Sequence, residues 1–185
     1  MNSNLDHIIT GCRLQERESQ RDLYDMYKDV LFAICMRYLK EPENAEDVFI
    51  EGFYKILSRI DDFKGEGSFE GWMKRIMVNE SLMFLRKNNN LRMTVELSGN
   101  DVVESSNSDD EILFEELLLA LNELPTGYRT ILNMYILEGY KHREIAEILG
   151  ISINTSKSQL ILARKRAQEI LKKKDKLNNY NYKTG

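Results

Sequence analysis

Apolar residues recur every three to four positions along most of the chain, which predicts helices separated by short breaks. The first strongly periodic stretch runs from about residue 22 to residue 39, with apolar positions at Leu23, Met26, Tyr27, Val30, Leu31, Ile34, Tyr38 and Leu39. The next stretch follows Pro42, a residue favoured in the first turn of a helix. Its expected buried face is Ala45, Val48, Phe49, Phe53, Ile56, Leu57 and Ile60.

A third helix is predicted from Phe69 to about Lys87, after a loop at residues 61–68 that ends in Ser68, a good N-cap. Its expected apolar side is Phe69, Trp72, Met73, Ile76, Met77, Met83 and Phe84. Cations, Asn79 and an indole on this helix suit stacking on unpaired bases and hydrogen bonding to them. We interpret Phe69 as a core anchor, whereas Trp72 fits a core position and a base-stacking position equally well.

Nine acidic residues and no Lys or Arg lie between Thr94 and Glu123. The first part of this stretch lacks periodicity, which is typical of a linker. We therefore predict an all-α protein of two small helical domains, at residues 21–90 and 111–177, joined by an acidic linker at residues 91–110. Residues 1–20 are expected to be a flexible lead, and residues 178–185 a tail.

Residues 140–174 predict two helices joined by a tight turn, with Gly150 ending the first and Ser152 capping the second. The expected buried face of the second helix is Ile153, Ser156, Leu160, Ala163 and Ala167. Its opposite face is Asn154, Thr155, Lys157, Ser158, Gln159, Ile161, Leu162, Arg164 and Lys165. This layout is that of a helix-turn-helix, whose second helix lies in the major groove of DNA. An amphipathic hairpin with a solvated basic face is the alternative.

Charge favours the DNA-binding interpretation. Residues 141–176 hold ten Lys or Arg against four acids, a net charge of +6, although the whole chain carries −4. With Lys183 outside this window, residues 1–140 carry −11. Such asymmetry predicts one end that contacts phosphate and another that does not.

Several classes of protein are excluded by what the sequence lacks. It has no apolar run long enough to span a bilayer and no secretion signal at the N-terminus, so we expect a cytoplasmic protein that does not insert into a membrane. Cys12 and Cys35 give neither a disulfide framework nor zinc spacing, and Cys35 suits a buried apolar position. Without a phosphate-binding glycine loop or a nucleophile motif, we expect no enzyme activity, no cofactor and no metal.

Motifs in both halves of the chain resemble those of bacterial RNA polymerase sigma factors of the small, two-domain extracytoplasmic-function (ECF) type. The resemblance covers roughly residues 20–175. Its motifs are ENAEDVFIEGFYKI, FKGEGSFEGWMKRIMVNESLMFLRK and ALNELPTGYRTILNMYILEGYKHREIAEILGISINTSKSQLILARK. It implies a region 2-like domain followed by a region 4-like domain. It also implies core RNA polymerase and promoter DNA as partners, and it allows an anti-sigma factor as another.

The resemblance also implies three functional surfaces. The residues implied to dock on the coiled coil of the polymerase largest subunit are Glu46, Asp47, Ile50, Glu51 and Tyr54. Capture of the unpaired −10 element, with one base flipped from the stack, falls to Phe63, Ser68, Trp72, Arg75 and Asn79. In the −35 element, the residues implied to contact base edges are Thr155, Ser158, Gln159 and Leu162. Those implied to bind phosphates are Lys157, Arg164 and Lys165.

Two positions depart from the family pattern, since the family usually has Gln at Ile50 and often Ser at Lys141. Two other functions remain open at this point. A conventional helix-turn-helix regulator that does not replace the sigma subunit would account for residues 140–174 and leave the block from Phe63 to Asn79 unexplained. A nuclease would need a carboxylate cluster that binds metal, whereas the carboxylates here fall on the linker and on the expected docking surface.

Overall fold

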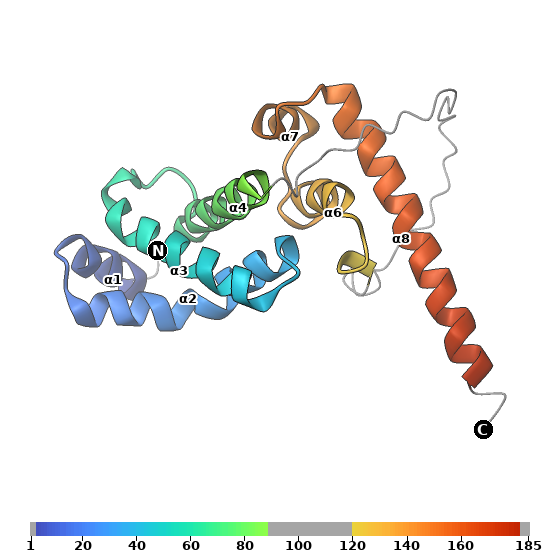
Figure 1. Cartoon of the computed structure of the whole chain (residues 1–185). Helices are drawn as coiled ribbons and strands as arrows, with labels where there is room; N and C mark the ends of the chain where they lie inside the picture. The colour runs from blue at the N-terminus through green and yellow to red at the C-terminus, as the bar shows by residue number, and fades with distance from the viewer. Residues whose placement is uncertain (1–2, 89–119, 182–185) are drawn as a thin grey trace. The chain divides into compact units, whose positions relative to one another are not determined.

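The computed structural model describes residues 3–88 and 120–181, and within these ranges the ordered elements are all helical (Figure 1). The chain divides into two compact units, Met1–Asn90 and Leu91–Gly185. This arrangement confirms the predicted all-α class with two domains. The predicted acidic linker at residues 91–110 lies outside the described residues.

The first unit consists of helices packed around one apolar core. Its elements are α1 (Ser3–Arg13), α2 (Arg17–Tyr38), α3 (Pro42–Ser58), the short 3₁₀ helix η1 (Ile60–Asp62) and α4 (Phe69–Lys87). Helices α2, α3 and α4 pack against one another, and α1 packs on α2. Side chains with almost no exposed surface form the centre of this core: Leu23, Leu31, Ile34, Tyr38, Ile56, Ile60, Met73, Met77 and Leu82.

Helix α1 corrects the expectation of a flexible lead at residues 1–20. Ile8, Ile9 and Cys12 are buried. The Ser19 side chain of α2 packs so closely on the backbone of α1 that a Cβ added to Gly11 would lie 1.9 Å from Ser19 Oγ. An eleven-residue helix is marginally stable on its own, so tertiary packing on α2 is what orders this segment.

The predicted faces of the other helices agree unevenly with the structure. Six of the seven residues expected inside from the α3 stretch are buried, and Leu57 is half-buried. On α2, however, Met26 and Val30 of the apolar stripe are 45% and 43% exposed, and on α4 Met83 of the expected apolar side is 55% exposed. Val78, Ser81, Leu82 and Leu85, which were not on the expected apolar side, are buried in this part of α4.

The second unit combines α6 (Thr126–Leu132), the π-helix η2 (Asn133–Leu137), α7 (His142–Leu149) and the long α8 (Ile153–Asn181). Both α6 and α7 pack against α8. Its apolar core is Ala120, Leu121, Leu124, Leu132, Ala163, Ala167 and Ile170. Helix α8 continues through Asn181, so the tail predicted from residue 178 begins too early, and residues 182–185 lie outside the described residues.

The turn between α7 and α8 has the predicted geometry. Gly150 adopts φ 69° and ψ 36°, a left-handed conformation that favours glycine because it has no Cβ. The hydroxyl of Ser152 accepts a hydrogen bond from the Thr155 N–H at 2.9 Å, so Ser152 caps α8. At the start of α7, the Glu144 carboxylate accepts from the Lys141 N–H at 2.7 Å. This bond compensates in part for the absence of the Ser that the family often has at the position of Lys141.

Candidate nucleic-acid interfaces

One face of α4 presents the residues expected to contact unpaired bases. Trp72, Arg75 and Asn79 occur at i, i+3 and i+7, a spacing that places them on the same side of a helix. Arg75 and Asn79 are exposed and Trp72 is half-buried. The guanidinium and the amide are therefore accessible to a ligand, with the indole beside them.

A cluster of three aromatic rings joins the loop before α4 to this face. The ring centroids of Phe63 and Phe69 are 5.0 Å apart, and those of Phe63 and Trp72 are 5.9 Å apart. Phe69 and Trp72 stack at 5.5 Å with an interplanar angle of 22°. Phe69 is only 4% exposed, which confirms it as a core anchor. Trp72 packs on Phe69 and keeps part of its surface exposed, so its base-stacking role stays a prediction that its position allows.

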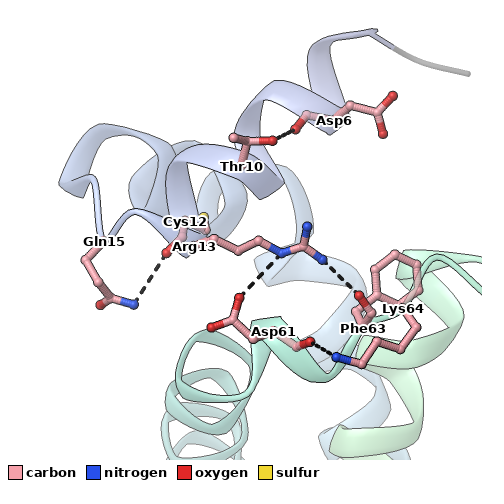
Figure 2. Close-up of polar contacts among 8 residues, drawn as sticks. All are labelled: Asp6, Thr10, Cys12, Arg13, Gln15, Asp61, Phe63 and Lys64. Atoms are coloured by element: carbon pink, nitrogen blue, oxygen red, sulfur yellow. Dashed lines mark hydrogen bonds and ion pairs between the residues drawn. The ribbon is translucent and has the colours of Figure 1, made fainter.

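The loop itself is held by polar contacts (Figure 2). Ser68 caps α4 by accepting from the Gly71 N–H at 3.3 Å, so its hydroxyl has a structural partner. Lys64 Nζ donates to the Asp61 carbonyl at 2.9 Å. Arg13 Nη2 donates to the Phe63 carbonyl at 2.8 Å, and Arg13 Nε lies 3.6 Å from Asp61 Oδ1. The sequence reasoning missed Arg13, although the helical spacing of Ile8, Ile9 and Cys12 could have indicated α1.

The acidic face of α3 is exposed along its whole predicted length. Glu46, Ile50 and Tyr54 follow one another at i, i+4 and i+8, so they form a single row. Ile50 is 65% exposed and Tyr54 is 71% exposed, although both have large apolar surfaces. Asp47 and Glu51 are exposed beside this row. An apolar strip bordered by carboxylates is the surface expected of a docking site for another protein.

An ion pair holds α3 against α4. Lys55 Nζ lies 3.3 Å from Glu51 Oε1 and 2.5 Å from Glu80 Oε2. The bond with Glu80 is the largest cause of the raised pKa of Lys55. Because Glu80 follows Asn79 directly, this contact fixes the part of α4 that carries Asn79 relative to α3.

The exposed face of α8 is basic near its start. Lys157, Arg164 and Lys165 are exposed, and Thr155, Ser158 and Leu162 are half-buried. The hydroxyl of Ser158 donates to the Thr155 carbonyl at 3.1 Å. Lys157 and Arg164 are seven residues apart, or two turns, so both cations lie on one side of the helix.

The predicted position of Gln159 on this exposed face is wrong, because Gln159 is only 6% exposed. At about 100° per residue, Gln159 lies roughly 50° from the line through Ser156 and Ala163, which marks the centre of the buried stripe. Ile153 lies roughly 70° from that line. Accordingly Ile153, predicted to be buried, is 44% exposed.

His142 connects α7 to the recognition helix. Its Nδ1 lies 2.9 Å from Ser156 Oγ, and its ring stacks on Tyr135 with centroids 4.5 Å apart. Burial lowers the pKa of His142, and the positive charges of Lys157 and Arg164 lower it further. The imidazole is therefore neutral at pH 7 and packs beneath a positively charged surface.

The lowered pKa makes stability depend on pH. His142 takes up a proton more readily in the unfolded chain than in the folded protein. The contribution of neutral His142 to folding stability is therefore complete above the ordinary pKa of 6.5 and is lost as pH falls through the folded-state pKa. We expect urea unfolding followed by circular dichroism to show lower stability at about pH 5.5 than at about pH 7.5. The decrease should be smaller in His142→Gln. Equal decreases in the two proteins would contradict this role of His142.

Both cysteines are buried. Burial raises the pKa of the Cys12 thiol and of the Cys35 thiol to about 11, so both stay protonated near neutral pH. This confirms the apolar interpretation of Cys35. Within residues 3–88 and 120–181, no three His, Cys, Asp or Glu side chains gather as ligands for a metal ion. No helix in the same ranges has the length and apolar character needed to cross a membrane.

Comparison with known proteins assigns each unit to a sequence family. Sigma-70 region 2 matches residues 23–91, and Sigma-70, region 4 matches residues 114–166. The RNA polymerase sigma factor SigV of Bacillus subtilis is 30% identical over 151 residues, which are 80% of this chain and 89% of SigV. The ECF RNA polymerase sigma factor SigW of the same organism is 28% identical over 171 residues, covering 85% of this chain and 89% of SigW.

Two solved structures share the fold. One is the sigma factor RpoE from Bartonella quintana in complex with the anti-sigma factor NepR, with a TM-score of 0.52, 23% identity, and coverage of 82% of this chain and 96% of that one. The other is CnrH in complex with the cytosolic domain of CnrY, with a TM-score of 0.51, 18% identity, and coverage of 89% and 95%. The matched regions and the identity to SigV together show that the chain belongs to the sigma-70 family, as a promoter-recognising sigma factor of the extracytoplasmic-function type.

Proposed function

We propose that the two units of this sigma factor divide the work of promoter recognition. The first unit docks on core RNA polymerase through the exposed row of α3 and captures unpaired −10 bases on α4. The second unit binds the −35 duplex through the exposed face of α8. The protein acts in the cytoplasm as a specificity subunit and performs no catalysis of its own.

The observation that carries this proposal is the two-sided character of α4. Its buried side holds Phe69 in the core, while Arg75 and Asn79 are exposed next to the half-buried Trp72. Separating DNA strands costs about 1.4 kcal/mol of stacking per step. A surface that binds only unpaired bases stabilises the open state selectively, and thereby drives melting.

The second unit supplies the sequence-independent attraction for duplex DNA. Lys157, Arg164 and Lys165 suit phosphate oxygens, and Thr155, Ser158 and Leu162 suit base edges in the major groove. Gln159 is left out of the proposed contacts because its side chain is buried in this structure. The neutral His142 beneath this surface adds no positive charge of its own.

Regulation by another protein is part of the proposal. Two solved structures of similar fold are complexes of a sigma factor with an anti-sigma factor and of CnrH with the cytosolic domain of CnrY. We infer that an anti-sigma factor also binds this chain. The exposed apolar strip of α3, Ile50 and Tyr54, is the surface we expect such a partner to cover, because covering it would block polymerase docking.

Run-off transcription with purified core polymerase tests the proposed function. The chain should direct a discrete transcript from the promoter that its holoenzyme selects out of genomic fragments. A conventional helix-turn-helix regulator would leave core polymerase without promoter-dependent activity and would bind duplex DNA as a dimer. Absence of a discrete transcript, together with dimeric binding of duplex DNA, would contradict the proposal.

Lys157→Ala should weaken −35 duplex binding and reduce the dependence of its affinity on salt. Loss of one phosphate contact lowers the slope of log affinity against log salt by about one. Lys173→Ala is the matched control, because Lys173 is exposed on the same helix about 24 Å further along. The slope is measured by fluorescence anisotropy over a series of salt concentrations. An unchanged slope in Lys157→Ala would mean that Lys157 does not contact the backbone.

A further inference from the structure

Arg13 connects helix α1 to the segment at residues 61–63, just before α4. Arg13 is the last residue of α1, and the loop lies about fifty positions further along the chain. The guanidinium of Arg13 contacts two residues of this segment, through a hydrogen bond to the Phe63 carbonyl at 2.8 Å and an ion pair with Asp61 at 3.6 Å (Figure 2). One side chain thus connects the N-terminal helix to both η1 and the residue after it.

Arg13 is presented from an ordered base. Ile8, Ile9 and Cys12 fix α1 in the core, and the close approach of Gly11 to Ser19 holds α1 against α2. The Glu16 N–H also donates to the Gly11 carbonyl at 3.0 Å, which closes the turn after α1. The position of the guanidinium is therefore set by packing of the helix that carries it.

Arg13 spans a cleft between α1 and the loop, which both polar side chains and the apolar side chains of Ile9 and Phe63 line. The cleft has a volume of about 620 Å³, with Asp6 and Thr10 on the α1 side and Lys64 and Gly65 on the loop side. A Cβ added to Gly65 or to Gly67 would meet no atom within 4 Å. The hydrogen bond and the ion pair of Arg13 cross this cleft, so they restrain the loop relative to α1 directly.

The restraint acts directly on the aromatic cluster. Fixing the Phe63 carbonyl limits the backbone of Phe63, and the ring of Phe63 contacts both Phe69 and Trp72. Phe69 is anchored in the core, so Phe63 is held from its backbone side by Arg13 and from its ring side by Phe69. Loss of Arg13 would leave only the second of these two restraints.

We propose that Arg13 is a positioning residue for capture of the unpaired strand. By fixing the loop at Phe63, it preorganises the surface formed by Phe63 and Trp72, so the ordering cost of that surface is met before DNA binds. This inference rests on the proposed function of α4. Arg13 acts through the loop and is assigned no contact with DNA.

The chain contains one tryptophan, which gives a direct test in the protein without DNA. Trp72 lies 5.9 Å from the Phe63 ring, so its fluorescence reports on the loop. In Arg13→Gln, acrylamide should quench Trp72 more strongly than in the wild type, with an unchanged circular dichroism spectrum. Arg21→Gln is the matched control, because the ion pair of Arg21 is with Asp25 on α2 itself. Equal quenching in the wild type and Arg13→Gln would overturn the positioning role.

The second test measures capture of unpaired DNA. Holoenzyme made with core polymerase is used to select from a pool of single-stranded oligonucleotides of randomised sequence. Arg13→Gln should bind the sequence enriched by the wild type about tenfold more weakly, as expected when one charged hydrogen bond is lost. Binding to duplex DNA that contains the −35 element should not change. Arg13→Lys, which retains the charge and one donor group, should recover part of the loss.

The outcomes separate this inference from the function on which it rests. If the wild-type holoenzyme enriches no single-stranded sequence, the proposed role of the first unit fails. If the wild type enriches a sequence that Arg13→Gln binds equally well, only the role of Arg13 fails. Should Arg13→Gln fold poorly, Arg13→Met provides the same test, because it keeps the aliphatic stem of the side chain and removes both the hydrogen bond to Phe63 and the ion pair with Asp61. In that case Arg13→Met must raise Trp72 quenching and weaken capture, and wild-type values for both would overturn the proposal.

Discussion

Asn79→Ala should slow promoter opening about thirtyfold while leaving binding to the closed duplex unchanged. Asn79 is exposed on α4, so its removal costs little folding stability. Its amide can donate to one base and accept from it, and each such bond contributes about 1 kcal/mol. These bonds form only with unpaired bases, so their loss raises the barrier to the open state alone.

Trp72→Ala should have a larger effect on the same step. Stacking of a base on an aromatic ring contributes about 1–3 kcal/mol, and Trp72→Ala also removes the partner on which Phe69 stacks. Opening is measured by the fluorescence of 2-aminopurine in the −10 element, and closed binding by gel shift at low temperature. Asn88→Ala is the matched amide control, since Asn88 is exposed just past the end of α4. Equal losses in the opening and closed-binding measurements would remove the melting role.

Tyr54→Ala should weaken the complex with core polymerase about thirtyfold. Truncation of an aromatic residue at the centre of an interface typically costs about 2 kcal/mol or more. Tyr54 is 71% exposed, so the substitution leaves the core of the first unit intact. The affinity is measured by titration of fluorescently labelled protein with core polymerase.

Two further variants sharpen this measurement. Met26→Ala removes an exposed apolar side chain from α2 and should bind polymerase like the wild type. Ile50→Gln introduces the residue that the family usually has at this position and should also retain binding. A wild-type affinity for Tyr54→Ala would contradict the assignment of docking to the exposed row of α3.

The sequence pattern predicted elements best where both faces of a helix were strongly marked. The α3 stretch has a continuous apolar stripe opposed by acids, and its faces match the structure closely. Gly150 and Ser152 were predictable because each position has a specific local requirement, a positive φ and a hydroxyl acceptor. Local chemistry of this kind needs no knowledge of the surrounding fold.

Other features depended on tertiary contacts that a periodicity argument cannot supply. Helix α1 is short and is ordered by its packing on α2. Its sequence alone therefore has the character of a flexible lead. Gln159 was expected to be exposed and is buried, whereas Ile153 was expected to be buried and is exposed. The prediction centred the buried stripe of α8 too close to Ile153 because Ile153 is the more hydrophobic residue. Small residues, Ser156 and Ala163, mark the true centre, and their low hydrophobicity conceals the close helix contact that they permit.

In the candidate site, too, local sequence pattern predicted some residues, and others depended on tertiary contacts. Motif resemblance identified the positions of Trp72, Arg75 and Asn79, and their common exposed face follows from helical spacing. It could not indicate Arg13, because the contact between Arg13 and Phe63 joins segments about fifty residues apart through a backbone carbonyl. A bond to a carbonyl places no requirement on the side chain of Phe63, so the sequence carries no signal for it.

Photo-crosslinking within the open promoter complex tests the division between the two units most directly. A benzophenone amino acid is placed at Met83, one turn after Asn79 on α4, and separately at Ile161, one turn after Lys157 on α8. Both positions are exposed, and both leave the proposed contact residues unchanged. We predict that position 83 crosslinks to the unpaired non-template strand at the −10 element and position 161 to the −35 duplex. Crosslinks from both positions to the same duplex segment, with none to the unpaired strand, would contradict the account.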